Sequence, residues 1–247
     1  MAYTYLITGA TSDVGTALIH RLLASAPADT LVLAQGCGDV EKLAPLVQKY
    51  PGQVRPFDVD LSDRLKVDAF VRLLEQSAPA PTHFVHLPAL PVVNTRFKNF
   101  DEDRFAKDLQ IQLNSAIAIC RVFVPKMAKA GFGRVLFIQT SYTIGCPPKN
   151  TAAYVIAKSA IGGLVKSMAV EYAPRHVTVN CVAPSMMETH FLKDTPDLIV
   201  QAAAADNPMG RNATPADVVP AMAFLLSEEA GFITGVTLPI TGGSAIV

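Results

Sequence analysis

The chain has 247 residues, half of them hydrophobic and only 17% charged, which is long for one domain by a crude rule but within the range of single α/β domains. Lysine plus arginine equals aspartate plus glutamate at 21 each, so a formal net charge of zero gives no electrostatic case for nucleic acid or an anionic membrane. Charges such as Arg121 interrupt the apolar runs before the ~20 residues of a membrane span, and no signal peptide opens the chain, so we expect a cytoplasmic protein.

Short apolar runs alternate with helical patterns from one end of the chain to the other. Strands are expected at residues 3–8, 30–35, 54–59, 83–87, 134–140, 178–183 and 234–240. Helices are expected near residues 14–26, 39–50, 63–77, 102–130, 152–173 and 215–227. Strands separated by helices imply right-handed crossovers and one parallel sheet. The sequence therefore predicts a Rossmann-type, doubly wound α/β fold in a single domain over residues 1–247.

The four cysteines are far apart in the sequence and form no C-x-x-C pair. Neither a zinc site nor a redox pair is indicated, and no metal is expected. We interpret these thiols as small core residues. They are Cys37, Cys120, Cys146 and Cys181.

A glycine-containing turn, TGATSDVG at residues 8–15, follows the first predicted strand and opens an amphipathic helix. This strand-turn-helix context is what a nucleotide-binding glycine motif requires. The turn must let backbone N–H groups approach a pyrophosphate, and the start of a helix carries partial positive charge that favours an anion. The N-terminal segment is therefore predicted to bind a dinucleotide.

Tyr154 and Lys158 stand four positions apart in a predicted helix, so they share one face of it. A cation beside a phenol lowers the pKa of the phenol from about 10, which would allow Tyr154 to act as a general acid or base. Ser141, at the end of an apolar strand, could hold a substrate oxygen by hydrogen bond. A chance Y-x-x-x-K is common in a chain of this length, so the pair gains its weight from the glycine turn.

The chain resembles the short-chain dehydrogenase/reductase family from Tyr3 to its C-terminus, and among its members the 3-oxoacyl-carrier-protein reductases. The segments that carry the resemblance are, in order, TGATSDVG, FDVD, HLPA, Asn114, Ser141, YVIAK, VNCVAPSMMET and FITGVTLPITGG. The resemblance implies that Tyr154 exchanges a proton with a substrate oxygen that Ser141 orients. It implies further that Lys158 lowers the pKa of Tyr154 and binds the nicotinamide ribose, and that Asn114 holds a water linking Lys158 to solvent.

The same resemblance implies an NAD(P) site. In it Asp58 would hold the adenine amino group, while a Met187 backbone group and the Thr189 hydroxyl would meet the carboxamide and phosphates. The implied cofactor-binding residues are Gly9, Thr11, Ser12, Asp13, Val14, Gly15, Gln35, Asp58, Val59, Pro88, Ala89, Tyr154, Lys158, Pro184, Met187 and Thr189.

Three segments depart from the family pattern around this site. Asp13 replaces the middle glycine of the turn, residues 86–89 (HLPA) replace Asn-Asn-Ala-Gly, and Ser185 replaces a glycine. We interpret His86 as a structural histidine. Gln35, at the end of the second strand, is neither the acid typical of NAD use nor the arginine typical of NADP use. The missing acid counts against strict NAD preference and the missing arginine against strong NADP preference, and Ser12 stands where many NADP-using relatives carry a basic residue. NADP(H) is weakly favoured over NAD(H).

Residues 186–212 occupy the place of the family's substrate lid, and their apolar character suits a substrate with apolar surface. The expected substrate is a small carbonyl or alcohol, with a 3-oxoacyl thioester on a carrier protein as the nearest common role. Against a carrier, Val170 stands where such reductases often place a basic residue, and Lys126, Lys129 and Arg134 are a weak substitute. A homo-oligomer, dimer or tetramer, is implied by the resemblance.

Two alternatives stay open at the level of sequence. The three departures around the cofactor motivate a degenerate binding or assembly subunit, which the intact Asn114, Ser141, Tyr154 and Lys158 set opposes. The same groups could also serve a dehydratase or epimerase without net redox change. Cofactor binding and a panel of ketones separate these functions.

Overall fold

A computed structural model describes residues 3–246. Its centre is a seven-stranded, all-parallel sheet in the order β3-β2-β1-β4-β5-β6-β7. The strands are β1 (Thr4–Thr8), β2 (Leu31–Gly36), β3 (Val54–Asp58), β4 (His83–His86), β5 (Gly133–Ile138), β6 (Val177–Pro184) and β7 (Thr237–Ile240). The predicted Rossmann-type fold is confirmed, and β7 begins three residues later than the sequence pattern indicated.

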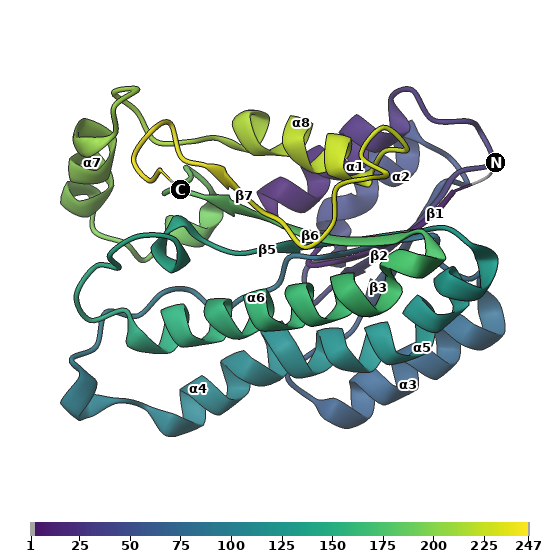
Figure 1. Ribbon diagram of the computed structural model, residues 1–247, viewed down its shortest axis with the longest axis horizontal. Helices are drawn as coiled ribbons and strands as arrows, with labels where there is room; N and C mark the ends of the chain where they lie inside the picture. Colours follow the sequence, from purple (N-terminus) through teal and green to yellow (C-terminus); the bar gives the residue numbers. More distant parts are fainter. Residues whose placement is uncertain (1–2, 247) are drawn as a thin grey trace.

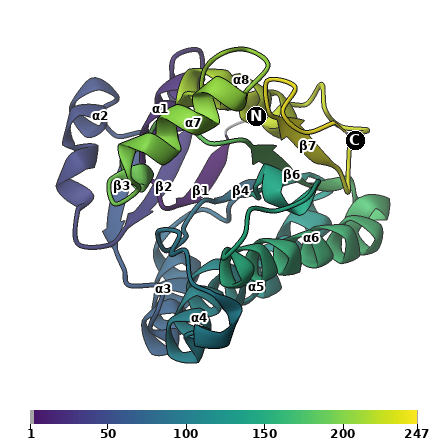
Figure 2. The ribbon, with the colours of Figure 1, turned by 90° about the vertical axis from the view of Figure 1, so that its left-hand side faces the viewer.

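Helices cover both faces of the sheet and make three layers (Figures 1 and 2). One face carries α1 (Asp13–Leu23), α2 (Ala44–Lys49) and α8 (Pro215–Leu226). The other carries α3 (Arg64–Ser77), α5 (Ser115–Ala130) and α6 (Ala152–Tyr172). Because successive strand residues point to opposite faces, Ile7 of β1 packs into the core beneath α1 and α8, and Leu6 into the core beneath α3, α5 and α6.

The helix predicted over residues 102–130 is in fact three consecutive pieces. α4 (Glu102–Leu109) passes through a π-helical turn (Gln110–Asn114) into α5. Hydrophobic periodicity does not register the single wider turn, which is a feature that often marks functional sites. The helix predicted at 39–50 likewise begins as a 3-10 turn (Val40–Leu43) before α2.

The lid segment, residues 186–212, contains two elements that the sequence pattern did not predict. They are a 3-10 turn (His190–Leu192) and α7 (Asp197–Asp206), which stands at one end of the molecule, away from the sheet's helical layers (Figure 1). No side chain of α7 is buried among the described residues. The helix therefore lacks the buried stripe on which a prediction from sequence depends.

Within residues 3–246, the stretch Ala152–Arg175 is long and apolar enough to cross a membrane by length and composition alone. In the structure this stretch is α6 and the turn after it, and its side facing the sheet is buried at Ala157, Ile161 and Val165. The helix also carries the buried Lys158, and 33% of its apolar window is buried inside the structure.

The cysteines divide between two environments. Cys120 and Cys181 are buried as expected, whereas Cys37 and Cys146 are exposed. The interpretation of all four as core residues is therefore right for two of them. All four thiols are free.

Candidate active site

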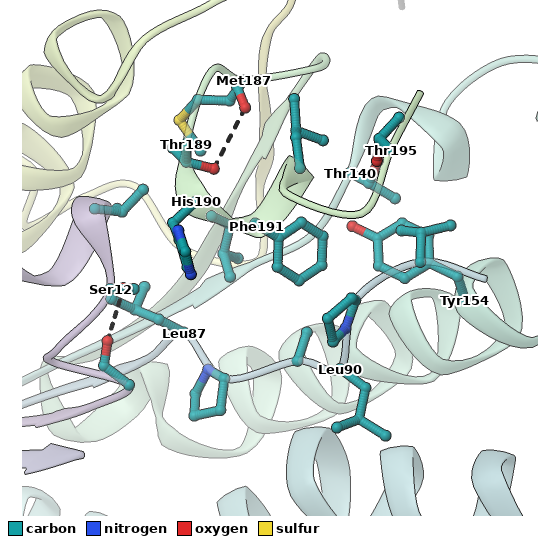
Figure 3. A pocket seen from close by; sticks show the side chains of 18 of the residues that line it. Ser12, Leu87, Leu90, Thr140, Tyr154, Met187, Thr189, His190, Phe191 and Thr195 are labelled. Carbon is teal, nitrogen blue, oxygen red and sulfur yellow. Dashed lines mark hydrogen bonds between the residues drawn. The ribbon is translucent and has the colours of Figure 1, made fainter. Parts of the chain in front are cut away.

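A cavity of about 1330 Å³ opens at the carboxyl ends of β1, β2, β4, β5 and β6. The chain reverses direction across the sheet between β1 and β4, and ligands of doubly wound folds bind in the crevice that this reversal creates. Figure 3 shows the lid residues Met187 to Phe191 on one side of the cavity and Leu87 and Leu90 on the other. The volume exceeds the ~300–1,000 Å³ of a typical small-ligand pocket, as a site for two molecules requires.

The glycine turn is shaped for close approach of a ligand to the backbone. Gly9 has φ +69°, a conformation that side chains rarely tolerate, and a Cβ there would lie 3.1 Å from the Pro88 nitrogen. Ser12 caps α1 by accepting the Gly15 N–H at 3.1 Å. Gly15 is buried inside the turn, where a Cβ would lie 2.7 Å from the Ala10 carbonyl oxygen, so its role is packing rather than ligand contact.

Asp13 lies at the first turn of α1, where negative charge and a phosphate would compete. Its carboxylate accepts a hydrogen bond from the His190 backbone N–H at 2.6 Å. The contact joins residues 177 positions apart and ties the lid segment to the N-terminus of α1. The residue that departs from the family pattern is thus a structural link across the mouth of the cofactor cradle.

The Gln35 side chain is held by hydrogen bonds to backbone groups at the end of β2 and in the neighbouring turns. Its side-chain oxygen accepts from the Gly9 N–H at 3.0 Å, and its amide nitrogen donates to the Gly36 and Val59 carbonyls at 2.8 and 2.7 Å. All three hydrogen bonds hold neighbouring segments of the predicted cofactor site. Val59 takes part through its backbone and is not on the cavity wall.

Two charged residues that sequence reasoning missed lie at this end of the cavity. Lys42 and Asp39 line it and form an ion pair of 2.9 Å. The predicted Asp58 is not on the wall, because its carboxylate turns to accept the Gly38 N–H at 2.7 Å. Asp60 lines the cavity instead. Counting residues along the sequence locates the ends of β2 and β3. It does not predict which side chains after those strands line the cavity.

Tyr154 and Lys158 are brought together on α6 as predicted, with the Lys158 nitrogen 5.8 Å from the centroid of the Tyr154 ring. Both line the cavity. Lys158 is 3% exposed and donates to the Ile138 carbonyl at 2.9 Å. Loss of water lowers the pKa of Lys158 to about 8, although the charge of Asp108 opposes the change.

The expected lowering of the Tyr154 pKa by Lys158 is not found. Burial raises the pKa of the phenol, and a hydrogen bond with the Thr140 hydroxyl opposes that rise only in part. The reason is geometric, since the Lys158 ammonium is directed to the Ile138 carbonyl. The phenol is therefore protonated at neutral pH and is prepared to donate a proton.

The structure separates Ser141 from the other predicted catalytic residues. Thr140 lines the main cavity with Tyr154, whereas Ser141 lines a smaller neighbouring pocket of about 270 Å³ with Asn207 and Ser244. Figure 3 shows Thr140 and the Tyr154 phenol in the same close-up of the cavity. The physical reason is that the backbone changes conformation between them, since Thr140 is extended whereas Ser141 begins a 3-10 turn.

Asn114 is likewise not on the cavity wall. It is exposed at the end of the π-helical turn and donates to the Gln110 side chain at 3.3 Å. Gln112 in the same turn is fully buried, donates to Asp108 at 2.7 Å, and leaves its side-chain oxygen without a partner among the described residues. Two positions correspond to about 200° around a helix, so the two amides face opposite ways.

His86 is structural, as expected. Its Nδ1 lies 2.7 Å from the Thr8 hydroxyl and its Nε2 lies 3.2 Å from the Ile111 carbonyl. Burial lowers the pKa of His86 to about 3, so the ring is neutral. Pro88 and Ala89, which follow it, line the cavity.

The remaining predicted cofactor residues gather on the cavity wall. They are Gly9, Thr11, Ser12, Asp13, Val14, Gln35, Pro88, Ala89, Pro184, Met187 and Thr189. Ser185, also on the wall, has a buried hydroxyl with no partner among the described residues. A glycine cradle, a helix N-terminus and an unpartnered donor at the far end fit a dinucleotide. The fold and the site define a Rossmann-type protein with a nucleotide-sized cleft that a buried tyrosine and lysine line.

Comparison with known proteins gives the family. A family model described as "Enoyl-(Acyl carrier protein) reductase" matches residues 9–245. The chain is 29% identical over 248 residues to 3-oxoacyl-[acyl-carrier-protein] reductase FabG of Thermotoga maritima, covering 98% of this chain and 97% of that protein. It is also 29% identical over 242 residues to nodulation protein G of a Rhizobium strain, with coverage of 98% and 96%.

Solved structures agree. A Beutenbergia cavernae protein, described as a candidate NAD(P)-dependent gluconate 5-dehydrogenase with bound NADP, superposes with a TM-score of 0.90 at 28% identity, covering 99% of this chain and 97% of that one. The chain belongs to the short-chain dehydrogenase/reductase family and is an NAD(P)-dependent oxidoreductase.

Proposed function

We propose that the protein reduces a ketone to a secondary alcohol, with Tyr154 as the proton donor. The observation that carries the proposal is the buried Tyr154 and Lys158 pair on the wall of a cavity whose other end is a glycine cradle. A bound NAD(P)H supplies the hydride. As the carbonyl carbon accepts it, the carbonyl oxygen takes the phenol proton, since an alkoxide is a far stronger base than a phenolate.

Lys158 would support this transfer by placing positive charge on the cavity wall, where it attracts the negative charge that develops on the reacting carbonyl oxygen. The raised pKa of the Tyr154 phenol keeps its proton in place until the reaction requires it, which favours reduction over oxidation near neutral pH. Pro184, Met187 and Thr189 would hold the nicotinamide end, and the α1 turn the pyrophosphate.

We propose NADP(H) as the preferred cofactor. Lys42 supports this preference, because it lies on the cavity wall just beyond β2, where a 2′-phosphate would be recognised. Its partner Asp39 keeps one carboxylate oxygen buried and unpartnered among the described residues. An ammonium that moves from Asp39 to a phosphate would exchange one anionic partner for a more highly charged one.

For the substrate we propose a ketone or small thioester with an apolar chain. Leu90, Pro91 and Val92 line the cavity opposite Phe191 and Leu192 of the lid. Relatives are named as 3-oxoacyl-[acyl-carrier-protein] reductases, which makes a 3-oxoacyl group the leading example.

A carrier-protein partner has less support than the acyl group itself. Lys126 is paired with Glu75 at 2.6 Å, and Arg134 is 5% exposed and donates to the Ser227 carbonyl at 3.0 Å. Neither is a free cation for an acidic carrier. We therefore propose a diffusible substrate, used by a cytoplasmic homo-oligomer, either dimer or tetramer.

The test is a fluorescence titration with NADPH and NADH, followed by steady-state assays with acetoacetyl-CoA, a carrier-bound 3-oxoacyl chain and simple ketones. We expect tighter binding of NADPH, and turnover that Tyr154→Phe reduces by orders of magnitude with little change in cofactor Kd. Absence of cofactor binding would instead indicate that the protein is a degenerate binding or assembly subunit. Binding with product formation but no net oxidation would indicate a dehydratase or epimerase.

A further inference from the structure

The segment after β5 presents two adjacent hydroxyls, and they line two different, adjoining pockets. Thr140 is 7% exposed, has extended backbone angles (φ −148°, ψ 151°) and faces the main cavity. Ser141 begins the 3-10 turn Ser141–Thr143 and lines the smaller pocket, which does not include Tyr154. A ligand oxygen beside Tyr154 would therefore lie in the cavity that Thr140 lines, and not in the pocket that Ser141 lines.

The Thr140 hydroxyl is placed to donate. Its oxygen accepts a long contact from the Tyr142 N–H at 3.4 Å, which leaves its own hydrogen for another partner. The phenol of Tyr154 is the neighbour available to it, because both side chains line the main cavity and the interaction with Thr140 acts to lower the pKa of Tyr154, as donation to the phenol oxygen does. A carbonyl oxygen between the two groups would accept from both.

The threonine is also fixed in place. Its carbonyl accepts the Thr143 hydroxyl at 2.8 Å and the Thr143 N–H at 3.1 Å. The preceding Gln139 donates to the Lys158 carbonyl on α6 at 2.9 Å. The strand end that carries Thr140 is thus bonded directly to the helix that carries Tyr154, and the distance between their hydroxyls is set by protein contacts rather than by a flexible loop.

We propose that Thr140, and not Ser141, is the catalytic residue that holds the substrate's carbonyl oxygen beside Tyr154 during hydride transfer. This inference rests on the proposed ketone reduction. The Thr140 hydroxyl remains protonated throughout and stabilises the negative charge that develops on the oxygen before the phenol proton arrives.

The experiment compares Thr140→Val, Thr140→Ser and Ser141→Ala in the full chain. The valine keeps the shape of threonine without the hydroxyl. Removing a donor to a developing oxyanion costs about 10²–10³ in kcat, so Thr140→Val should lose that much with an unchanged Kd for NADPH. Thr140→Ser should recover most of the turnover, and Ser141→Ala should stay within about threefold of wild type, because a surface-pocket hydroxyl makes no contact with the reacting atoms.

A second measurement does not depend on turnover. In the dead-end complex with NADP⁺ and the ketone, hydride transfer cannot occur, and ketone binding is followed by calorimetry. Thr140→Val should weaken ketone binding by about 2- to 12-fold, the equivalent of one hydrogen bond of 0.5–1.5 kcal/mol, while Ser141→Ala should not. Thermal unfolding and NADPH titration confirm that each variant folds.

The inference is overturned if Ser141→Ala loses as much turnover as Tyr154→Phe while Thr140→Val remains near wild type. It is equally overturned if both hydroxyl variants remain active. In either case Tyr154→Phe would still be inactive and ketone reduction would stand. If the wild-type protein neither binds NADPH nor reduces any ketone, the proposed function itself fails, and the role of Thr140 fails with it.

Discussion

Lys158 is a buried cation whose charge depends on a small number of neighbours. The groups that face it are Tyr154 on its own helix, His86 on β4, Asp108 on α4 and Cys181 on β6. His86 is neutral because burial lowers its pKa to about 3, and Cys181 is neutral because burial raises its pKa to about 11. Asp108 is therefore the charge that keeps the pKa of Lys158 from falling further.

The pH dependence of turnover should follow from this balance. Because the pKa of Lys158 is lowered to about 8, its supporting charge is present below that pH and is lost as the pH rises through it. Activity should decline above about pH 8. Asp108→Asn removes a charge that raises the Lys158 pKa, so the alkaline decline should move to lower pH. The measurement is kcat/KM for the ketone as a function of pH at saturating NADPH. An alkaline decline in Asp108→Asn at the same pH as in wild type, or at a higher pH, would contradict the prediction.

At this scale, the sequence predicted residue types better than residue positions. Tyr154 and Lys158 were found because a four-residue spacing in a helix is unambiguous. Ser141 was expected beside Tyr154, whereas the structure places Thr140 on the same cavity wall as Tyr154, a one-residue difference that a strand-end pattern does not resolve. Asn114 was expected at the site but is exposed at the end of a π-helical turn that nothing in the sequence pattern reveals.

At the scale of elements, the N-terminus of α1 and the lid segment act on each other through Asp13. Its carboxylate accepts the His190 N–H at 2.6 Å and also places negative charge at the end of α1 that should attract a phosphate. The two effects can be separated, because an asparagine side chain retains an acceptor oxygen and loses the charge.

We therefore expect Asp13→Asn to bind NADPH about two- to fivefold more tightly, the equivalent of 0.3–1 kcal/mol for a charge at a helix end. Asp13→Ala loses the charge and the acceptor, so amides of residues 186–212 should exchange faster with solvent than in Asp13→Asn. Fluorescence titration and hydrogen exchange by mass spectrometry provide the two measurements. Weaker NADPH binding by Asp13→Asn would show that the tie to His190, rather than the charge, controls the cofactor site.

Element order was predictable because each strand is a short apolar run bounded by turns, and alternation with helices implies one parallel sheet. The order of the strands within that sheet came from the structure. A helix whose side chains form no buried apolar face was not predictable. α7 contributes no buried side chain among the described residues, so its sequence carries no periodic signal for a core. Asp39 and Lys42 fall at the start of the helix predicted over residues 39–50, but nothing in the apolar pattern indicated that the 3-10 turn there lines the cavity.

At the scale of the whole molecule, β4 joins the two helical layers through two histidines. It is the central strand of the sheet, and His83 and His86 lie near its opposite ends. The Nε2 of His83 lies 3.1 Å from the Leu226 carbonyl of α8, and the Nε2 of His86 lies 3.2 Å from the Ile111 carbonyl in the opposite layer. Both rings are buried, and burial lowers the pKa of each to about 3.

These histidines should make stability depend on pH. In the unfolded chain each ring takes up a proton below about pH 6.5, whereas the folded protein resists protonation down to about pH 3. Their contribution is complete above pH 6.5 and is lost as the pH falls towards 3, at a rate approaching 1.4 kcal/mol per pH unit for each histidine. Urea unfolding should therefore show a free energy of unfolding markedly lower at pH 5 than at pH 7.

The variant His83→Phe isolates one half of this effect. Tyr3, Tyr5 and Phe132 surround the His83 ring, so phenylalanine should be accommodated among them at the cost of the contact with Leu226. We expect lower stability at pH 7 but a smaller loss between pH 7 and pH 5, by up to about 2 kcal/mol, because one proton fewer is taken up on unfolding. His20→Gln, at an exposed position, is the control and should keep the wild-type slope. A slope for His83→Phe equal to that of wild type would exclude His83 as a source of acid lability.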